Sequence, residues 1–487
     1  MVRLGMITNK IDYKVYSNKP FAIWANSRII NERLSANSYN RDYLDFAKAK
    51  NTFNFKKVSD IAKVTAMIGW KGLTTDDYVD EDGVYLLRTV DIKDNYIDLE
   101  NAVMAKREKV YEQPQIILKQ GDIIFSKDGT LGITAIVPRH QNKEMCVGST
   151  LARIRLNSNL DNYYVCAAFM SKIVQAQIGY FTSGIAQPHI TQEYINKLEI
   201  PIPSPEIQKY IGDKVRKAEE LREEAKRLKK EAEEILNREL NLNKLEESLK
   251  SSINSKHNWI TSMDINDRID SYYYKRRYIL VNQHLNDYEC IQIRDIASVD
   301  YGYMPTEDYA DENNGVPLIR VTNMIGNLLL DLSDLKYISK SINIPDDKYV
   351  DDGDILVVQC GNTTGKIALM TKEVENYLYP SFCLRIKLRN KSINNKYLAL
   401  LMEMSIIQEQ IWQSASYSSV RPNTTKPAIE NIRIPLIEKQ KQEDVGALVE
   451  KYIDNIYQSK QLILEAKQDV EDLIEGNFDM SKVKANS

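Results

Sequence analysis

Short apolar runs rich in β-branched residues mark strands in the first half of the chain. The clearest are Ile123–Phe125, Gly132–Val137 and Leu151–Leu156, and the last alternates its side chains at a period of two. That period is typical of a strand. A Gly-Asp pair precedes the first run and is typical of a turn that leads into a strand. The region is therefore predicted to be a mixed α/β domain.

A heptad pattern follows the strand region. Between Glu206 and Lys250 there is no proline and only one glycine. Apolar residues recur every seven positions along two lines, Ala218–Ala225–Ala232 and Leu221–Leu228–Ile235. This spacing places one apolar seam along a long helix, as in coiled coils. Charges of both signs fill the other positions, so the outer face of the helix is predicted to be solvated.

The same order of patterns occurs a second time. Gly121–Ile124 corresponds to Gly353–Leu356, at 353 − 121 = 232, and Arg33–Ser35 corresponds to Arg268–Asp270, at 268 − 33 = 235. A second heptad pattern runs through Val449, Ile456, Ile463 and Val470, with Tyr452, Ala466 and Leu473 on the neighbouring line. The chain is therefore predicted to be a tandem repeat of two similar units, about 1–250 and 251–487.

We predict an α+β fold with two tandem mixed α/β domains and two long helices that form an antiparallel coiled coil. The predicted segments are an N-terminal segment (1–51), the first domain (52–204), a central long helix (205–250), a linker with the first helix of the second repeat (251–289), the second domain (290–436), and a C-terminal long helix with a tail (437–487). Each helix could instead dock on its own domain. Heptads that continue past Leu228 and Ile463 favour the coiled coil.

Composition and charge exclude several classes of protein. Lys and Arg total 65 and Asp and Glu total 68, so the net charge of −3 excludes a polybasic coat for nucleic acid but not a local basic groove. No apolar run approaches the ~18 residues of a membrane span. The five cysteines are scattered without a C-x-x-C pair, which argues against a disulfide framework and a zinc ribbon and fits the cytoplasm.

The sequence carries no catalytic signature that we recognise, and we predict neither catalytic nor metal-binding residues. It contains no G-x-S-x-G, H-E-x-x-H or G-x-G-x-x-G, and its four histidines do not cluster. Gly361–Lys366 is similar to a phosphate loop, but three residues rather than four separate the glycines, and Ile367 replaces the Ser or Thr that would hold magnesium. A turn between two strands is the better interpretation.

An ordered set of motifs, occurring twice, resembles one protein family. In the first copy it consists of Gly121–Ile124, Gly129–Gly132, Thr182–Gln187, Ile200–Pro203 and Glu206–Gln208. Over nearly the whole chain, this order resembles the specificity (S) subunit of type I restriction–modification systems. The second copy departs from it, because its loop Ala415–Asn423 lacks the Gly-x-x-Gln and its segment Ile434–Ile437 lacks the second proline.

The resemblance implies a non-catalytic DNA-binding subunit. Each mixed domain would be a target-recognition domain for one half of an asymmetric bipartite sequence in double-stranded DNA. The coiled coil would set the gap between the halves and dock two methyltransferase (M) subunits, and motor nuclease (R) subunits would complete the complex. S-adenosylmethionine, ATP and magnesium would belong to those partners, with no cofactor on this chain and no membrane contact.

Candidate DNA contacts lie in turns and loops of both copies. Gln187 and Asn423 are suited to adenine and Arg421 to guanine, while Lys127 and Lys366 lie in matching turns and could reach phosphates. In the first copy the full set is Trp70, Lys71, Thr74, Arg88, Lys127, Thr130, Ser183, Gln187 and His189. In the second copy it is Tyr301, Tyr303, Arg320, Gln359, Asn362, Lys366, Ser419, Arg421, Asn423 and Lys426.

Structural roles are the alternative for each of these residues. Loop glutamines, asparagines and lysines could cap turns or face solvent, and Trp70 could be buried. Arg88 and Arg320 match across the repeat, which favours a shared role such as a backbone clamp or an ion pair. For the whole chain, the alternatives are a coiled-coil scaffold whose repeats bind protein, and a self-contained nuclease. Salt-sensitive DNA binding and magnesium-dependent cleavage would distinguish them.

Overall fold

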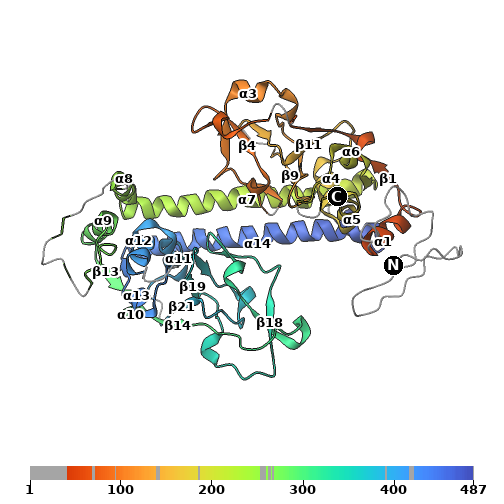
Figure 1. The fold of residues 1–487 in the computed structure, drawn as a ribbon. Coiled ribbons are helices and arrows are strands. Elements are labelled where there is room, and N and C mark those ends of the chain that lie inside the picture. Colours follow the sequence, from red (N-terminus) through yellow and green to blue (C-terminus); the bar gives the residue numbers. More distant parts are fainter. Residues whose placement is uncertain are drawn as a thin grey trace. The chain divides into compact units, whose positions relative to one another are not determined.

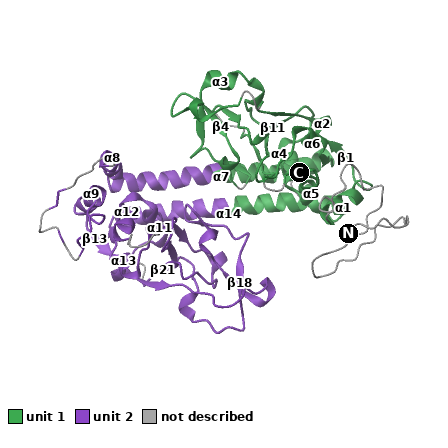
Figure 2. Cartoon of the chain, in the orientation of Figure 1, with its two compact units in different colours: residues 1–222, 457–487 green, residues 223–456 purple. Residues whose placement is uncertain are grey.

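The computed structural model describes residues 41–68, 72–93, 95–138, 143–184, 187–252, 259–260, 265, 268–389, 392–415 and 422–485. The chain divides into two compact units, shown in Figure 2. Unit 1 contains residues 1–222 and 457–487, and unit 2 contains residues 223–456. Two long helices, α7 (Pro205–Glu239) and α14 (Lys439–Glu475), are labelled in Figure 1. Each has one part in each unit, as the colours of Figure 2 show.

Unit 1 combines helices with two four-stranded sheets. Its further described helices are α1 (Arg41–Ala49), α2 (Val58–Ile61), α3 (Arg107–Tyr111), α4 (Asn162–Met170), α5 (Lys172–Phe181), α6 (Gln192–Lys197) and α15 (Ser481–Ala485). Its described strands are β1 (Phe55–Lys57), β2 (Ala62–Ala66), β3 (Tyr78–Val79), β4 (Val84–Leu87), β5 (Ile92–Lys93), β6 (Tyr96–Ile97), β7 (Val103–Ala105), β8 (Ile123–Ser126), β9 (Thr134–Ile136), β10 (Met145–Val147), β11 (Leu151–Leu156) and β12 (Glu199–Pro201).

The central sheet of unit 1 is antiparallel and has the order β2-β11-β8-β9. Ile123 and Phe125 of β8 pack in one core with helices α4 and α5, whereas Ile124 packs in a second core with the sheet β10-β4-β7-β3. Both faces of the strand are therefore covered, which explains why its apolar residues follow one another without alternation. The three strands predicted from apolar runs are confirmed as β8, β9 and β11.

Unit 2 repeats this framework. Its further described helices are α8 (Leu242–Ser252), α9 (Arg276–Leu285), α10 (Ile293–Ile296), α11 (Asn395–Glu403), α12 (Ser405–Ser414) and α13 (Lys426–Glu430). Its described strands are β13 (Cys290–Gln292), β14 (Ala297–Tyr301), β15 (Gly315–Leu318), β16 (Met324–Gly326), β17 (Leu329–Leu330), β18 (Lys336–Ser339), β19 (Ile355–Val358), β20 (Ile367–Leu369), β21 (Cys383–Leu388) and β22 (Arg433–Pro435). The central sheet has the matching order β14-β21-β19-β20, and β13-β22 matches β1-β12.

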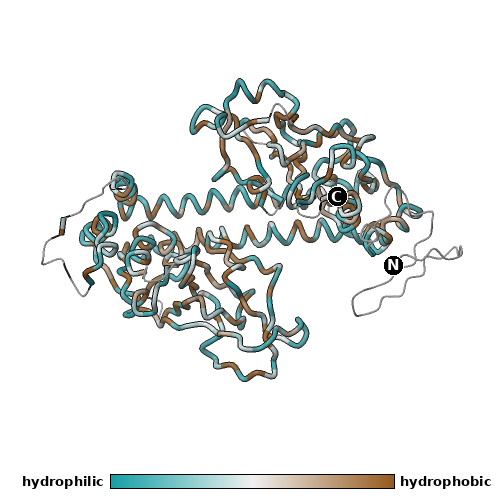
Figure 3. The backbone as a smooth tube through the Cα atoms, in the orientation of Figure 1, coloured by the Kyte–Doolittle hydropathy of each residue, from teal (hydrophilic) through white to brown (hydrophobic). Residues whose placement is uncertain are grey.

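The second layer of strands has the same pairing pattern in both units, with shorter pairings in unit 2. Unit 1 has the four-stranded sheet β10-β4-β7-β3, in which β10 and β4 run parallel. In unit 2 the antiparallel pairs β15-β18 and β16-β17 match β4-β7 and β5-β6 of unit 1. Two isolated bridges, the parallel Leu318–Leu378 and the antiparallel Ala310–Tyr337, lie where unit 1 has β4-β10 and β3-β7. Figure 3 shows hydrophobic residues along the strands of both units and mostly hydrophilic ones along α7. The repeat is therefore confirmed for both layers of strands.

Side-chain hydrogen bonds at equivalent positions also repeat. The hydroxyl of Tyr164 donates to the Pro201 carbonyl at 2.8 Å, and that of Tyr397 donates to the Pro435 carbonyl at 2.9 Å. Each pair joins a helix to the strand that ends the domain. Because both tyrosines are deeply buried, desolvation raises the pKa of each phenol above its ordinary value. The two prolines that punctuate the sequence therefore mark the same structural position in both units.

The turn after each central strand also uses one design. Gly132 and Gly365 have positive φ angles of 75° and 86°. The side-chain amide of Gln175 donates to the Gly132 carbonyl at 3.0 Å, and that of Gln408 donates to the Gly365 carbonyl at 2.8 Å. A Cβ atom on either glycine would lie 2.8 Å from the oxygen of the facing glutamine. The turn therefore requires glycine in both units.

Within unit 1, α7 and α14 run antiparallel. Lys214 of α7 pairs with Asp469 of α14 at 2.6 Å, and Arg222, farther along α7, donates to Ser459, earlier on α14, at 3.2 Å. In unit 2, Lys229 of α7 and Tyr452 of α14 both bond Asn327 of the β16-β17 turn, at 2.6 and 2.9 Å. The two long helices predicted from the heptads are confirmed.

Two details of the first long helix were predicted wrongly. The helix predicted over 205–250 ends at Glu239, because Asn241 has a φ of +47°, a conformation through which an α-helix does not continue. Ala218, Ala225 and Ala232 of the predicted seam are fully buried. Leu221 and Ile235 are only partly buried, because Arg222 and Leu236 take the buried positions one residue later. The straight helix has 3.6 residues per turn, so the seam drifts away from a strict heptad.

Candidate functional site

Two loops of unit 1 are joined beside its central sheet. The turn 127–133 connects β8 to β9, and the segment 182–190 lies between α5 and α6. Asp128 and His189 form a β-bridge between these loops, and the amide of Gly129 donates to the Pro188 carbonyl at 3.1 Å. We call residues 127–133 and 182–190, in their described part, the loop pair of unit 1.

Five of the candidate residues meet on the loop pair of unit 1. Ser183 and His189 exchange two backbone hydrogen bonds of 2.9 and 2.8 Å, and the Ser183 hydroxyl lies 3.0 Å from Nδ1 of His189. Thr130, Gln187 and His189 are exposed. Lys127 is partly exposed, and its ammonium group lies 2.5 Å from the Asp128 carboxylate. The loop pair therefore presents hydroxyl, amide, imidazole and ammonium groups on one surface.

Unit 2 has an equivalent loop pair, which we define as residues 359–366 and 422–425. Cys360 and Asn423 form the matching β-bridge, and the amide of Thr424 donates to the Gln359 carbonyl at 2.9 Å. The candidates Gln359, Asn362 and Asn423 lie here, with Asn362 and Asn423 exposed. The same backbone arrangement therefore carries a different set of side chains in each unit.

Lys366 lies at the far end of this turn and contacts another element. Its ammonium group donates to the Met324 carbonyl of β16 at 3.0 Å. Gln359 holds the turn position that matches Lys127. The backbone amide of each donates to the carbonyl of the residue just before β11 or β21, Thr150 in unit 1 and Phe382 in unit 2. The two lysines therefore occupy different positions in their turns, and phosphate contact by Lys366 stays a prediction.

Arg88 and Arg320 lie at equivalent structural positions. Arg88 makes two hydrogen bonds of 3.0 Å with Asp91, which raise the pKa of its guanidinium group. Arg320 pairs with Asp334 at 2.6 Å. The backbone amides of both arginines are capped by the side chain three residues later, in the 3-10 helices Thr89–Asp91 and Val321–Asn323. These contacts favour the structural ion-pair interpretation.

Thr74 begins another short 3-10 helix, Thr75–Asp77. Its amide and hydroxyl bond the Asp77 carboxylate at 2.9 and 3.1 Å. The backbone hydrogen bond from Thr74 is the main reason that the pKa of Asp77 is lowered. The geometry therefore gives Thr74 a capping role, while a DNA contact stays a prediction. The candidates Trp70, Lys71, Ser419 and Arg421 lie outside the described residues.

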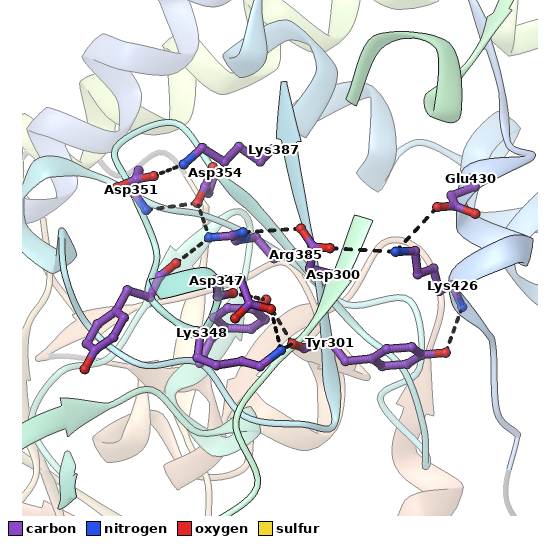
Figure 4. Close-up of polar contacts among 12 residues, drawn as sticks. Asp300, Tyr301, Asp347, Lys348, Asp351, Asp354, Arg385, Lys387, Lys426 and Glu430 are labelled. Atoms are coloured by element: carbon purple, nitrogen blue, oxygen red, sulfur yellow. Dashed lines mark hydrogen bonds and ion pairs between the residues drawn. The ribbon is translucent and has the colours of Figure 1, made fainter. Parts of the chain in front are cut away.

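Tyr301 and Lys426 meet beside the loop pair of unit 2, in the group of contacts shown in Figure 4. The backbone amide of Lys426 donates a hydrogen bond to the Tyr301 hydroxyl at 3.3 Å. The ammonium group of Lys426 lies 3.7 Å from the Asp300 carboxylate. Asp300 pairs with Arg385 of β21 at 3.3 Å, and Arg385 lies 3.7 Å from Asp354. We call Asp300, Asp354, Arg385 and Lys426 the charged network.

The charged network connects the loop pair of unit 2 to the central sheet. Lys426 begins α13, directly after the loop pair, whereas Arg385 is buried in the sheet. Desolvation raises the pKa of the buried Asp354 carboxyl to about 6. In unit 1 the first residue of the equivalent helix is Gln192, which donates to the Val64 carbonyl at 2.8 Å. A neutral hydrogen bond there replaces the ionic contacts of unit 2.

Tyr303 lies on the segment that follows β14. Its hydroxyl donates to the Glu307 carboxylate at 3.1 Å, and its amide donates to the Tyr379 carbonyl at 2.8 Å. The neighbouring Gly302 allows this close approach, because a Cβ atom there would lie 2.2 Å from the Pro380 carbonyl oxygen. A DNA contact by Tyr303 also stays a prediction.

Two residues at this edge of the central sheets were not predicted as candidates from the sequence. Thr150 and Phe382 stand immediately before β11 and β21. The amide of Lys127 donates to the Thr150 carbonyl at 2.9 Å, and the amide of Gln359 donates to the Phe382 carbonyl at 2.8 Å. The spacing 382 − 150 = 232 equals the repeat offset, and that signal could have identified the pair.

The chemistry of both loop pairs is that of recognition. Exposed amides and hydroxyls donate and accept hydrogen bonds, and such groups can recognise base edges. Among the described residues, no group of three or more His, Cys, Asp or Glu side chains is placed to hold a metal ion. No helix in the described part of the chain combines the length and apolar character that a membrane crossing needs.

Two solved structures are similar to the chain. The S subunit of a type I restriction–modification system from M. genitalium is 13% identical, with a TM-score of 0.44, and the match covers 88% of this chain and 97% of that one. The HsdS subunit from Thermoanaerobacter tengcongensis is 14% identical, with a TM-score of 0.29 and the same coverage. None of the curated protein sequences compared with the chain matches it.

A family model matches the chain twice. It describes the type I restriction modification DNA specificity domain and covers residues 50–234 and 285–468. Each match begins before the first strand of a mixed domain and ends within one of the long helices. Together the matches cover well over half of the sequence. The chain therefore belongs to the family of type I restriction–modification DNA specificity subunits.

Proposed function

We propose that each unit recognises one half of an asymmetric, bipartite sequence in double-stranded DNA. One observation carries the proposal: the same sheet and the same backbone bridge support different side chains in the two units. His189 bridges to Asp128 in unit 1, and Asn423 bridges to Cys360 in unit 2. A shared framework with different polar loops is suited to two different base sequences. We call the two halves of the target half-site 1 and half-site 2, after the units that bind them.

The long helices α7 and α14 set the spacing between the half-sites in this proposal. Each helix has one part in each unit, so the antiparallel pair connects the two recognition surfaces through regular structure. Two methyltransferase subunits dock along this scaffold, and motor nuclease subunits complete the complex. The chain itself performs no catalysis and binds no cofactor, and S-adenosylmethionine, ATP and magnesium belong to the partners.

The test is selection of DNA from a random duplex pool by the chain co-expressed with its methyltransferase partner. The expected product is one motif made of two unlike half-sequences separated by a fixed gap. Binding should weaken steeply with salt, because contacts with phosphates release counterions. Recovery of no sequence preference, with binding that is indifferent to salt, would contradict the proposal and favour a protein-binding scaffold.

A matched pair of variants makes the selection sharper. Gln187→Ala changes an exposed side chain of the loop pair of unit 1, and Thr52→Ala changes an exposed residue after α1 in the same unit, whose hydroxyl donates to the Ala49 carbonyl at 3.1 Å. We expect the first variant to lose base preference at one position of half-site 1. We expect the second to keep the motif unchanged, even where it lowers stability.

A further inference from the structure

Phe382 exposes an aromatic ring at the edge of the central sheet of unit 2. Its side chain is 54% exposed. Its carbonyl accepts the Gln359 amide, and the following amide, that of Cys383, donates to the Pro380 carbonyl at 2.9 Å. The backbone is therefore fixed in a turn, while a ring whose burial would stabilise the fold stays in contact with water.

Two further large side chains are exposed on the adjacent segment. Tyr301 is 41% exposed and Met304 is 65% exposed. Their segment lies beside the turn that carries Phe382, because the amide of Ser381 donates to the Tyr303 carbonyl at 2.8 Å. Several exposed large side chains on segments joined by backbone hydrogen bonds, in contrast to a single one, are typical of a binding surface. The Gln359 amide, which donates to the Phe382 carbonyl, joins these segments to the loop pair of unit 2.

Unit 1 has a polar residue at the same position. Thr150 makes the equivalent backbone bond with Lys127, and its hydroxyl bonds the hydroxyl of Thr89 at 3.1 Å. Its side chain is smaller, partly buried and engaged in a hydrogen bond. The contrast between Thr150 and Phe382 therefore lies on the recognition surface itself and distinguishes the two units chemically.

An aromatic ring beside base-recognising amides is suited to one feature of the major groove. Thymine presents a C5-methyl group there, and apolar side chains recognise it by contact without a hydrogen bond. We propose that Phe382 contacts the C5-methyl group of a thymine in half-site 2. This inference rests on the proposed function, since it names a specificity residue of the same surface. A 5-methylcytosine carries the same group at the same place.

The test uses the full chain in its complex with the methyltransferase partner and the DNA motif selected as described above. Each thymine of the motif is replaced in turn by deoxyuridine, which lacks the methyl group but keeps every hydrogen-bonding group. At one thymine of half-site 2 we expect binding to weaken about fourfold, as the removal of one buried methyl group implies. A 5-methylcytosine–guanine pair at that position, compared with cytosine–guanine, shows whether the methyl group is recognised on either base.

The variant Phe382→Thr copies the residue of unit 1 and should bind thymine and deoxyuridine equally at that position. Its preference for half-site 1 should be unchanged, which shows that the protein is folded. A half-site 2 without thymine, equal binding of both bases by the original chain, or undiminished discrimination by Phe382→Thr would each overturn the inference. Those results leave the sequence-specific binding of the complex intact, whereas failure of the proposed function removes the selected motif altogether.

Discussion

Asp354 and Asp122 hold equivalent positions before their central strands but have different ionic partners. Asp122 accepts two hydrogen bonds of 2.6 Å from Arg155. The residue equivalent to Arg155 in unit 2 is Lys387, which pairs with Asp351 instead. Asp354 is left with the Asp351 amide at 2.9 Å and Arg385 at 3.7 Å. Burial therefore dominates and raises the pKa of Asp354.

The first prediction concerns the effect of pH on unit 2. Burial raises the pKa of Asp354 from 3.8 to about 6, so the folded state favours the protonated carboxyl. The stabilisation that this carboxyl group adds to the free energy of unfolding is fully present below pH 3.8 and is lost as the pH rises through about 6. The full effect is about 3 kcal/mol, since one pKa unit corresponds to about 1.4 kcal/mol. Asp354→Asn should lack this dependence.

Hydrogen exchange of peptides from β19 and β21, corrected for the intrinsic effect of pH on exchange, measures this local stability. Burial also raises the pKa values of Glu403 and Glu409, but both residues are present in the original chain and in the variant. The stability difference between the two proteins isolates Asp354. A difference that stays constant from pH 4 to pH 7 would count against the assignment.

The second prediction concerns the amides on the loop pairs. Replacing Asn423 with Ala should relax base preference in half-site 2 only, and Gln187→Ala should do so in half-site 1 only. A bidentate contact with a base contributes about 1–3 kcal/mol of discrimination. Competition binding with each possible base at each position measures the change. Equal loss at both half-sites in either variant would contradict separate recognition by the two units.

At the scale of elements, hydrophobic patterns identified the long strands and helices. Leu151–Leu156 is β11, in which apolar side chains alternate with Arg153 and Arg155. The two-residue strands β3, β5, β6 and β17 were not predictable, because tertiary contacts hold such short segments extended. The break at Asn241 was also missed, since the apolar pattern continues through it into α8.

The candidate site was only partly predictable for a related reason. The sequence placed Lys127, Gln187 and His189 in loops but gave no sign that a β-bridge joins those loops. It also gave no sign that the Lys366 ammonium group donates to the Met324 carbonyl, and it suggested an ion pair for Arg88 without identifying Asp91 as the partner. Such contacts depend on side-chain directions in the folded chain, which periodicity does not encode.

The third prediction concerns the helix pair inside unit 1. Burial alone would lower the pKa of Lys214, but hydrogen bonds with Asp469 and Glu465 raise this pKa above its ordinary value. Lys214→Met should destabilise the pairing of α7 and α14 in unit 1 by about 1.5–3 kcal/mol, because Asp469, which is only 2% exposed, loses one charged hydrogen bond but keeps Lys482 at 3.1 Å. Urea denaturation measures the change.

Lys217→Met is the matched control on the same helix. Lys217 pairs with Glu220 at 3.4 Å, and both side chains are largely exposed. Exposed pairs contribute about 0–1 kcal/mol, so this variant should resemble the original protein. Equal destabilisation by the two substitutions would show that the charge of α7, and not the buried contact, determines stability.

At the scale of the whole molecule, the chain is one scaffold used twice with different loops. The central sheets have the same strand order, and the Tyr164 and Tyr397 hydrogen bonds repeat. The side chains of the loop pairs and the ionic contacts beside them differ between the units. A framework of this kind allows two base sequences to be recognised by one chain, with the long helices as the shared element.

The fourth prediction tests the role of the long helices. One heptad inserted into α7 between residues 222 and 223, together with one inserted into α14 between residues 456 and 457, adds nearly two full turns to each helix. The apolar faces keep their register, and each helix lengthens by about 10 Å. The gap between the half-sites should grow by about 3 base pairs. An unchanged gap in the selected motif would contradict a spacing role.

In the proposed function, the two units recognise separate halves of one DNA target. The most direct test is the adenine-methylation map of cells that express the chain with its methyltransferase partner, compared with cells in which residues 52–204 are exchanged for those of another family member. We predict one gapped, asymmetric motif whose half-site 1 changes while half-site 2 and the gap stay the same. Loss of both halves together in a folded protein, or a map that does not change, would contradict the claim.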